Sequence, residues 1–341
     1  MNNNTQTAIA TAIELVAAGK ELSVELAESV MAELMDGEAV PVQVAALLAM
    51  LHVRGETATE LAAFARIMRA RAVSVAAPLE AVDLCGTGAD HSGSFNISTV
   101  ASLVVAGAGT PVAKHGNRAI TGQCGSADLV EALGIALDPG VERVQQAIRE
   151  AGFGFMFAPA YHPATRHVMP IRRSLPMRTI FNLLGPLSSP AAVRFQLLGV
   201  ADANLMWLIA AALSQLGLER ALVVHGSDGL DELTLSGINR ALLVEGDSIT
   251  EMTIDPAALG FSHAEPASLL GGDVQRNLEI AQSVLAGDAG AARDAVLLNA
   301  GAALFVAGAA SDVAEGLELA AAAIDSGRAA AVVANVAEVN S

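Results

Sequence analysis

The sequence contains few cysteines, few aromatic side chains and few positive charges. Its two cysteines, Cys85 and Cys124, form no CxxC pair, which argues against a zinc finger or a disulfide scaffold. Lysine and arginine number 19 against 36 aspartates and glutamates, giving a formal net charge of −17. General binding to nucleic acid or to an anionic membrane requires a cationic surface, so we expect neither as a partner.

Targeting and membrane-spanning segments are not predicted either. The first residues, Met1 to Thr7, are polar and do not show the basic-then-apolar profile of a signal peptide. Apolar runs are interrupted by glycine, proline or charge before they reach the length of a bilayer. The sequence therefore predicts a cytoplasmic protein.

Small aliphatic residues dominate what is present. Hydrophobic residues make up 53% of the 341 positions but aromatics only 3%, so a large core must be built mainly from Ala, Leu and Val. Helical spacing of apolar residues recurs four times before residue 75, with glycines as stops and a Thr57–Glu60 capping box. We expect an all-helical domain over residues 1–75, whose apolar stripes suggest a subunit interface and a homodimer.

The pattern of apolar residues changes after Pro78. Short apolar runs at 82–85, 111–114, 221–224 and 241–244 alternate with helical patterns at 98–106, 128–133, 205–216 and 291–306. Strands that alternate with helices indicate a mainly parallel sheet covered on both faces. The predicted fold is therefore α/β, with residues 76–341 forming the larger domain.

Ligands of open parallel sheets bind at the carboxyl ends of the strands, where two glycine-containing loops are expected. The first runs from Gly86 to Asp90 and continues into Phe95–Thr99 at a helix start; the second runs from Lys114 to Arg118 and on to Asp128. Glycine amides, a helix N-terminus and basic side chains suit phosphate groups. An ordinary turn with capping hydroxyls and a solvated basic turn are the structural alternatives. The first loop matches neither the dinucleotide fingerprint nor the P-loop.

Two further segments carry chemistry-bearing residues. Asp231 and Glu232 follow the strand at 221–224, and adjacent carboxylates could hold Mg²⁺, although acidic pairs are common on so acidic a surface. Arginines gather in the segment from Tyr161 to Leu187, where Arg172 could bind a carboxylate in bidentate fashion. For Arg173 and Arg178, surface positions or ion pairs are the simpler interpretation.

These motifs resemble those of anthranilate phosphoribosyltransferases. GTGxD, FNIST, KHGNRA, GSAD, the block HPA…RR…RTIFNLLGPL, GLDEL and RDAVLLNAGAAL occur in that family's order, from the first helices almost to the C-terminus. The resemblance implies a small helical domain, which takes in part of residues 160–185 and pairs two subunits, beside a larger α/β domain of the nucleoside phosphorylase and phosphoribosyltransferase type. It implies Mg²⁺, two ions per subunit, as cofactor.

The resemblance also assigns site residues. For phosphoribosyl pyrophosphate (PRPP) they are Gly86, Ala89, Asp90, Ser94, Asn96, Ile97, Ser98, Thr99, Lys114 and Ser126. For anthranilate they are Gly86, His115, Asn117, His162 and Arg172. For the metal they are Ser98, Asp231 and Glu232. The reaction needs no strong general base, and His115 is the candidate proton acceptor.

The sequence departs from the family pattern in three places. Ala89 stands where glycine is usual, Thr121–Gly122 stand where paired serines are usual, and Cys124 replaces a common serine. Two other functions are compatible with such a scaffold, namely a pyrimidine nucleoside phosphorylase and a non-catalytic nucleic-acid-binding relative. The acidic charge and the nearly complete loops disfavour the second, and the Asp231–Glu232 pair disfavours the first.

Overall fold

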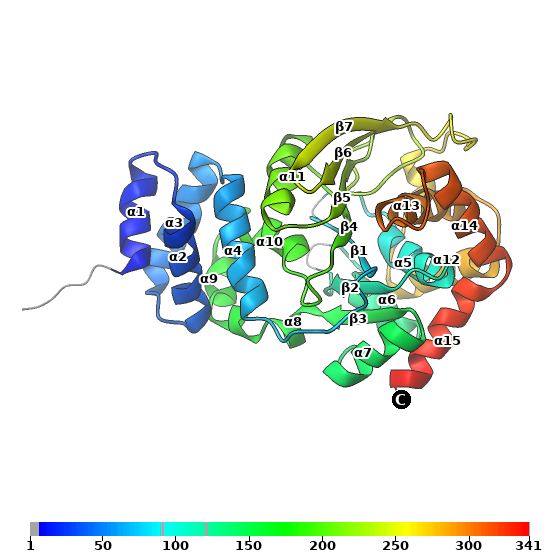
Figure 1. Ribbon diagram of the computed structural model, residues 1–341, viewed down its shortest axis with the longest axis horizontal. Helices are drawn as coiled ribbons and strands as arrows, with labels where there is room; N and C mark the ends of the chain where they lie inside the picture. Colours follow the sequence, from blue (N-terminus) through cyan, green and yellow to red (C-terminus); the bar gives the residue numbers. More distant parts are fainter. Residues whose placement is uncertain (1–6, 89, 91, 120–121, 341) are drawn as a thin grey trace, which may run out of the picture.

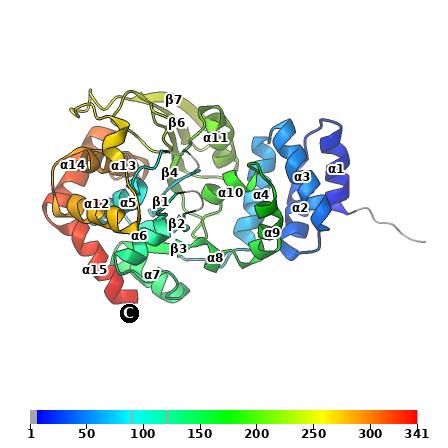
Figure 2. The same ribbon diagram turned by 180° about the vertical axis from the view of Figure 1, so that it is seen from behind.

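The computed structural model describes residues 7–88, 90, 92–119 and 122–340. The predictions made for Ala89 and Thr121 fall outside these residues. Figure 1 shows a bundle of helices at one end, a twisted sheet in the middle and a second layer of helices at the other end. The view from behind shows the same order of layers (Figure 2).

Four helices open the chain, as the apolar spacing predicts. They are α1 Ala8–Ala17, α2 Val24–Asp36, α3 Pro41–Arg54 and α4 Ala58–Ala70. The capping box at the start of α4 is formed by Thr57 and Glu60, and Pro41 occupies the first position of α3. Gly37 adopts a left-handed conformation (φ 74°) and ends α2, a geometry that costs glycine little.

The apolar stripes of these helices form one core with parts of the chain far away in sequence. Leu34, Leu47 and Leu51 are buried together with Val168 and Ile180, and α4 packs on α10 and α11. The stripes are thus covered within the subunit and do not by themselves provide a subunit interface. Because this core continues into the larger part of the chain, the division at residue 75 stays a prediction.

A seven-stranded sheet forms the centre of the α/β part, in the order β3-β2-β1-β4-β5-β6-β7. Strands β1 to β5 run parallel, and β6 and β7 add an antiparallel edge. Their bounds are β1 Val82–Gly86, β2 Val112–Gly116, β3 Phe153–Phe157, β4 Phe195–Gly199, β5 Arg220–His225, β6 Asn239–Glu245 and β7 Ser248–Ile254. The mainly parallel sheet predicted from the sequence is confirmed.

Both faces of the sheet are covered, and its central strands are mainly apolar on both of them. Leu197 and Leu222 face the C-terminal helices, whereas Leu198 and Val223 face α11 and the helical bundle. The remaining helices are α5 Ile97–Gly107, α6 Ser126–Ala132, α7 Val141–Glu150, α8 Ala158–Tyr161, α9 Met169–Ser174, α10 Phe181–Leu187, α11 Met206–Gln215, α12 Val274–Ala286, α13 Ala291–Val306, α14 Val313–Asp325 and α15 Arg328–Asn340. Short 3₁₀ helices are η1 Pro163–His167, η2 Ala203–Leu205 and η3 Pro266–Leu269.

The segment between α8 and α10 lies against the helical bundle, as the resemblance implies. Helix η1 packs on α2, and α9 packs on α3. Both Figure 1 and Figure 2 place α10 between α4 and the sheet, with α9 beside the helices of the bundle. Residues of this segment therefore reach the carboxyl ends of the strands from the side of the bundle.

Among the described residues, no single helix is both long and apolar enough to cross a bilayer. The pairs α12–α13 and α14–α15 reach the length and composition only when joined, and they are bent by 72° and 66° at the break.

Candidate active site

A pocket of about 360 Å³ opens where β1 and β2 end, facing the segment from α8 to α10. Seven of the residues predicted for the site line it. They are Gly86, Ser98, Lys114, His115, Asn117, Ser126 and Arg172. The pocket thus brings together residues from both glycine-containing loops and from the arginine-rich segment.

The first loop is held against the segment that carries Asp231 and Glu232 by a contact between a backbone N–H and a carboxylate. Gly88 donates its N–H to Oδ2 of Asp231 at 2.6 Å. A Cβ on Gly86 would lie only 2.2 Å from the same Oδ2, so glycine is required for the strand to approach the carboxylate this closely. The glycine of this motif therefore serves the approach of Asp231, in addition to exposing loop amides.

The start of helix α5 is joined to the other carboxylate. Ser98, in the first turn, donates its N–H to Oε1 of Glu232 at 3.1 Å. Its hydroxyl also accepts a hydrogen bond from Nζ of Lys114 at 3.4 Å. The structure places Ser98, Asp231 and Glu232 in one cluster, although they come from two strand ends separated by more than a hundred residues.

The carboxylates of this cluster are held close enough to disfavour ionisation. Burial, then the charge of nearby Asp90, raises the pKa of Asp231 to about 6. Burial, then the charge of Asp231, raises the pKa of Glu232 to about 8, opposed by Lys114. Such mutual repulsion would be relieved by a divalent cation. Within the described residues, no group of three or more His, Cys, Asp or Glu side chains is arranged to hold a metal ion.

Lys114 on β2 is the buried cation of the site. It is 2% exposed, and its Nζ donates to the carbonyl of Leu84. Burial lowers its pKa, and the charge of Asp83 is the largest opposing influence. Asp83, fully buried on β1, accepts the backbone N–H of His115 at 3.2 Å, and burial raises its pKa to about 6. Asp83 was not predicted from the sequence, where it is one residue of a buried strand.

The second loop is shaped by Ser126 at the start of α6. Its Oγ accepts the N–H of Asn117 at 3.2 Å and donates to the Asn117 carbonyl at 3.1 Å. Arg118 points the other way and forms ion pairs with Asp128 and Glu131 at 2.7 and 2.9 Å. Of the two basic residues in this loop, Lys114 alone is directed to the carboxylate cluster.

His115 lines the pocket, and His162, which does not line it, is buried beside the ring of His115. The ring centroids of His115 and His162 lie 5.1 Å apart at an interplanar angle of 57°. Burial lowers the pKa of His115 to about 3 and that of His162 to about 4, so both rings are neutral near pH 7. The backbone of Gly185 opposes this lowering of the pKa of His115, and Nε2 of His115 has no hydrogen-bond partner among the described residues.

Arg172 on α9 brings a guanidinium into the pocket from the side of the helical bundle. Burial lowers its pKa. Within the described part of the chain, none of the ion pairs involves it. A desolvated guanidinium without a carboxylate partner is unfavourable unless a ligand supplies the anion.

Several predicted residues do not line the pocket. Ile97 and Thr99 are buried in the first turn of α5, and Asn96 connects the two loops. Asp90 accepts hydrogen bonds from the N–H and hydroxyl of Ser92, which also donates toward Ser94. These side chains shape the first loop, and any contact they make with a ligand stays a prediction.

Other residues of the pocket were not singled out individually. The lining includes Phe181, Asn182, Gly185 and Pro186, from the RTIFNLLGPL block. This block is one of the motifs that carry the family resemblance. Its role was not predicted because the helix α10 reaches the site only through tertiary packing.

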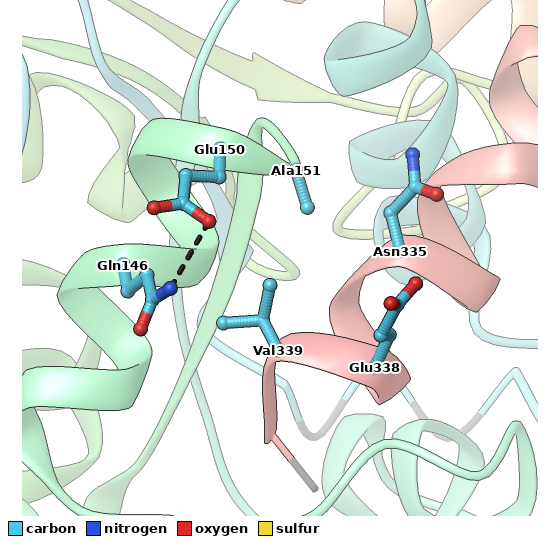
Figure 3. Close-up of a pocket in the computed structure, with 6 residues that line it drawn as sticks. All are labelled: Gln146, Glu150, Ala151, Asn335, Glu338 and Val339. Carbon is cyan, nitrogen blue, oxygen red and sulfur yellow. Dashed lines mark hydrogen bonds between the residues drawn. The ribbon is translucent and has the colours of Figure 1, made fainter.

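A second hollow of about 440 Å³ lies between α7 and α15, away from these loops (Figure 3). Gln146 and Glu150 of α7, joined by a 3.0 Å hydrogen bond, face Asn335, Glu338 and Val339 of α15. The residues that line it include no cation and no hydroxyl, so it offers nothing to a phosphate group. The pocket at the strand ends is the candidate active site.

Comparison with protein families gives two matches that together span most of the chain. Residues 10–72 match a glycosyl transferase family helical bundle domain, and residues 79–330 match the a/b domain of the same family. Anthranilate phosphoribosyltransferase from Solibacter usitatus is 52% identical over 322 residues, covering 94% of this chain and 95% of its own. The enzyme from Rubrobacter xylanophilus is 50% identical over 321 residues, covering 94% of each chain.

Solved structures give the same result. The anthranilate phosphoribosyltransferase from Thermus thermophilus matches with a TM-score of 0.93 and 43% identity, over 98% of this chain and 99% of that chain. The enzyme from Saccharomyces cerevisiae, solved in complex with PRPP and Mg, matches with a TM-score of 0.88 and 24% identity over 98% of each chain. At 24% identity, the match to the yeast structure shows that the fold is shared.

Proposed function

Because this chain belongs to the anthranilate phosphoribosyltransferase family, we propose that it transfers the phosphoribosyl group of PRPP to the amine of anthranilate. The products are N-(5-phosphoribosyl)anthranilate and pyrophosphate, and the reaction is the second step of tryptophan biosynthesis from chorismate.

The observation that carries the proposal is a pair of cationic side chains, Arg172 and Lys114, that line one pocket from different sides. Arg172, without a carboxylate partner among the described residues, lines one side, and Lys114 with the glycine-containing loops lines the other. An aromatic acid has one carboxylate for Arg172 and a nucleophilic amine to direct at the far side. PRPP has phosphates for the loop amides, Lys114 and the start of α5.

The acidic cluster fits a divalent cation that is shared with the diphosphate. Asp231 and Glu232 repel each other when both are ionised, and Mg²⁺ prefers one or two carboxylates with phosphate oxygens and waters. Mg²⁺, when bound, supplies positive charge to the departing pyrophosphate. We assign Asp231, Glu232 and Ser98 to this site, with two ions per subunit.

The chemistry needs positioning more than acid–base catalysis. The amine nitrogen of anthranilate forms a bond to the anomeric carbon, and the bond from that carbon to the pyrophosphate oxygen breaks. The electron pair leaves with pyrophosphate, whose charge the Lys114 ammonium and the loop amides stabilise. Arg172 holds the carboxylate so that the amine faces the ribose.

One proton must leave the new nitrogen. An arylammonium is a strong acid and gives up this proton readily, so a weak base is sufficient. His115 is neutral, and its unpartnered Nε2 can accept a proton in the tautomer that carries its hydrogen on the other ring nitrogen. We assign His115 this acceptor role, with His162 packed against it.

We also propose a homodimer formed through the helical domain. The internal stripes of the bundle are already covered, but three valines at α3 are not: Val40, Val42 and Val53 are 52%, 72% and 83% exposed. Apolar side chains exposed together on one helix are typical of a protein–protein contact. Light scattering of the purified protein would report a dimer, and replacing Val42 and Val53 with glutamate would shift it toward monomer.

The function is tested by mixing the purified protein with anthranilate, PRPP and Mg²⁺ and following the loss of anthranilate fluorescence. Parallel samples omit the metal or contain a pyrimidine nucleoside with phosphate. Metal-dependent loss of anthranilate with equal release of pyrophosphate supports the proposal. Cleavage of the nucleoside instead would favour a phosphorylase.

The metal assignment is tested separately with the double variant Asp231→Ala, Glu232→Ala. Turnover should fall by at least about a hundredfold at ordinary Mg²⁺, because several kcal/mol of charge stabilisation are removed from the leaving group. Near-normal rates in a folded double variant would refute the assignment.

A further inference from the structure

The segment from η3 into α12 covers the outer side of the first loop, and nothing in the proposed reaction uses it. Its backbone runs antiparallel to residues 93–95. Phe95 donates its N–H to the Leu269 carbonyl at 2.9 Å, and Gly271 donates to the Gly93 carbonyl at 2.9 Å. Ser94 and Leu270 form the bridge between these two bonds. Residues 93–95 of the first loop are thus paired with residues 269–271.

Asn277, in the first turn of α12, continues this contact with its side chain. It is 2% exposed, and its Oδ1 accepts the backbone N–H of Asn96 at 3.1 Å. Its Nδ2 donates to the carbonyls of Gly272 and Asp273 at 3.1 and 3.0 Å. Every polar atom of this amide is therefore directed either at the loop or at the turn that precedes α12.

The side chain of Asn96 in turn contacts the second loop. Its Nδ2 donates to the carbonyl of Cys124 at 3.2 Å, and its Oδ1 accepts from Sγ of Cys124 at 3.2 Å. The line Asn277–Asn96–Cys124 therefore connects helix α12 with both loops of the pocket. Asn96 also stands at the N-cap of α5, where the orientation of the backbone decides how the first helical amides point.

We propose that Asn277 is a positioning residue for the binding of PRPP. It holds the backbone of Asn96 so that the loop amides and the N-terminus of α5 are set before the substrate arrives. The inference rests on the proposed function only for the identity of the ligand. A loop that is ordered in advance loses less conformational entropy when it binds, so the benefit should appear in affinity more than in turnover.

The test uses Asn277→Leu, which keeps the approximate volume and removes all three hydrogen bonds. Direct titration of the protein with PRPP and Mg²⁺ should give a dissociation constant raised by about tenfold, as expected for one lost buried hydrogen bond. In turnover assays the KM for PRPP should rise to a similar extent, with kcat and the KM for anthranilate within about twofold of the original.

Glu60→Leu provides the control. Glu60 is also fully buried, and its carboxylate accepts the backbone N–H groups of Leu22 and Thr57 within the helical bundle, at 2.9 and 3.0 Å. Its replacement lowers the stability of the fold but should leave the affinity for PRPP unchanged, because neither partner belongs to a loop of the pocket. An equal loss of affinity in both variants would overturn the positioning role.

A second variant tests the same inference without touching Asn277. A Cβ on Gly271 would lie 2.9 Å from Cα of Phe95 and 3.0 Å from Nδ2 of Asn277, so Gly271→Ala should push the segment away from the loop. It should reproduce the loss of PRPP affinity even if Asn277→Leu fails to fold. Wild-type affinity in Gly271→Ala, or in a folded Asn277→Leu, overturns the proposal.

The binding experiment separates this inference from the proposed function. A wild-type chain that binds PRPP but does not consume anthranilate contradicts the function, while the variants still decide the role of Asn277. A wild-type chain that does not bind PRPP overturns both.

Discussion

The side chain of Asn299, on α13, forms hydrogen bonds with both the backbone N–H and the carbonyl of Leu233. Leu233 donates its N–H to Oδ1 of Asn299 at 3.0 Å, and Nδ2 of Asn299 donates to the Leu233 carbonyl at 2.8 Å. Both residues are fully buried. Since Leu233 directly follows Glu232, a helix near the C-terminus fixes the end of the loop that carries the proposed metal ligands.

Replacing Asn299 with leucine should therefore raise the Mg²⁺ concentration needed for half-maximal activity. We expect about a tenfold rise at saturating PRPP, because one or more buried backbone groups of Leu233 lose their partner and the loop shifts. Asn277→Leu is the matched comparison. It should raise the PRPP concentration needed for half-maximal activity, and it should change the Mg²⁺ concentration needed for half-maximal activity less than Asn299→Leu does. A folded Asn299→Leu protein with an unchanged Mg²⁺ requirement would contradict this prediction.

Arg172→Ala should weaken the use of anthranilate. The loss of a charge-assisted contact to a carboxylate corresponds to roughly a ten- to hundredfold rise in KM for anthranilate, with the KM for PRPP little changed. Arg172→Lys should have a KM for anthranilate between those of the original protein and Arg172→Ala, because lysine keeps the charge but not the paired donors. Arg173→Ala, at an exposed neighbour that does not line the pocket, serves as control. Unchanged anthranilate dependence in Arg172→Ala would remove the residue from the site.

The buried histidines predict how stability depends on pH. The pKa values of His115 and His162 are lowered to about 3 and 4 by burial, so the folded state favours the neutral rings. This contribution is complete above the unfolded pKa of about 6.5 and is lost as the pH falls toward the folded values. When the pH falls from 6.5 to 5, each buried ring should lower the free energy of unfolding by up to about 2 kcal/mol.

Urea unfolding at pH 7 and pH 5 measures this loss. His162→Gln cannot titrate, so the difference between the two pH values should shrink by about half of the histidine contribution. His263→Gln, at an exposed histidine paired with Glu265, is the control and should retain the difference of the original protein. If His162→Gln and the original protein lose equal stability, burial does not keep that ring neutral.

Cys124 should behave as a structural residue. Burial, and then the charge of Asp128, raises the pKa of its thiol to about 11, so little thiolate is present near neutral pH. Cys124→Ser should keep the hydrogen bond to Asn96 and retain turnover within about twofold. Mass spectrometry after exposure to iodoacetamide at pH 7.5 should show slow labelling of Cys124. Rapid labelling with loss of activity would instead indicate a reactive thiol.

The local structure of the site followed from the sequence where short-range physics decides it. The strand before Gly86, the helix after Asn96 and the capping box at Thr57 and Glu60 were all predicted from apolar spacing and end signals. The clustering of Gly86, Ser98 and Lys114 followed from the rule that parallel strands place their carboxyl ends on one edge.

The contributions of Asp83, Asn277 and Asn299 could not be predicted in this way. An acid within an apolar strand and two asparagines within helices show no unusual spacing, and their partners lie 32, 181 and 66 positions away in the chain. Their role depends on which loop each amide or carboxylate meets after packing.

The sequence by itself determined the elements, the alternation of strand and helix and the residues at the strand ends, because these depend on neighbours a few positions apart. Only the tertiary structure decided that Arg172 lines the pocket and that Asp231 lies against Gly86. It also decided that α12 and α13 form hydrogen bonds with the first loop and with the segment after Glu232. Those relationships arise from burial of apolar faces that are distant along the chain, and the buried polar groups then had to find partners wherever the packing brought them.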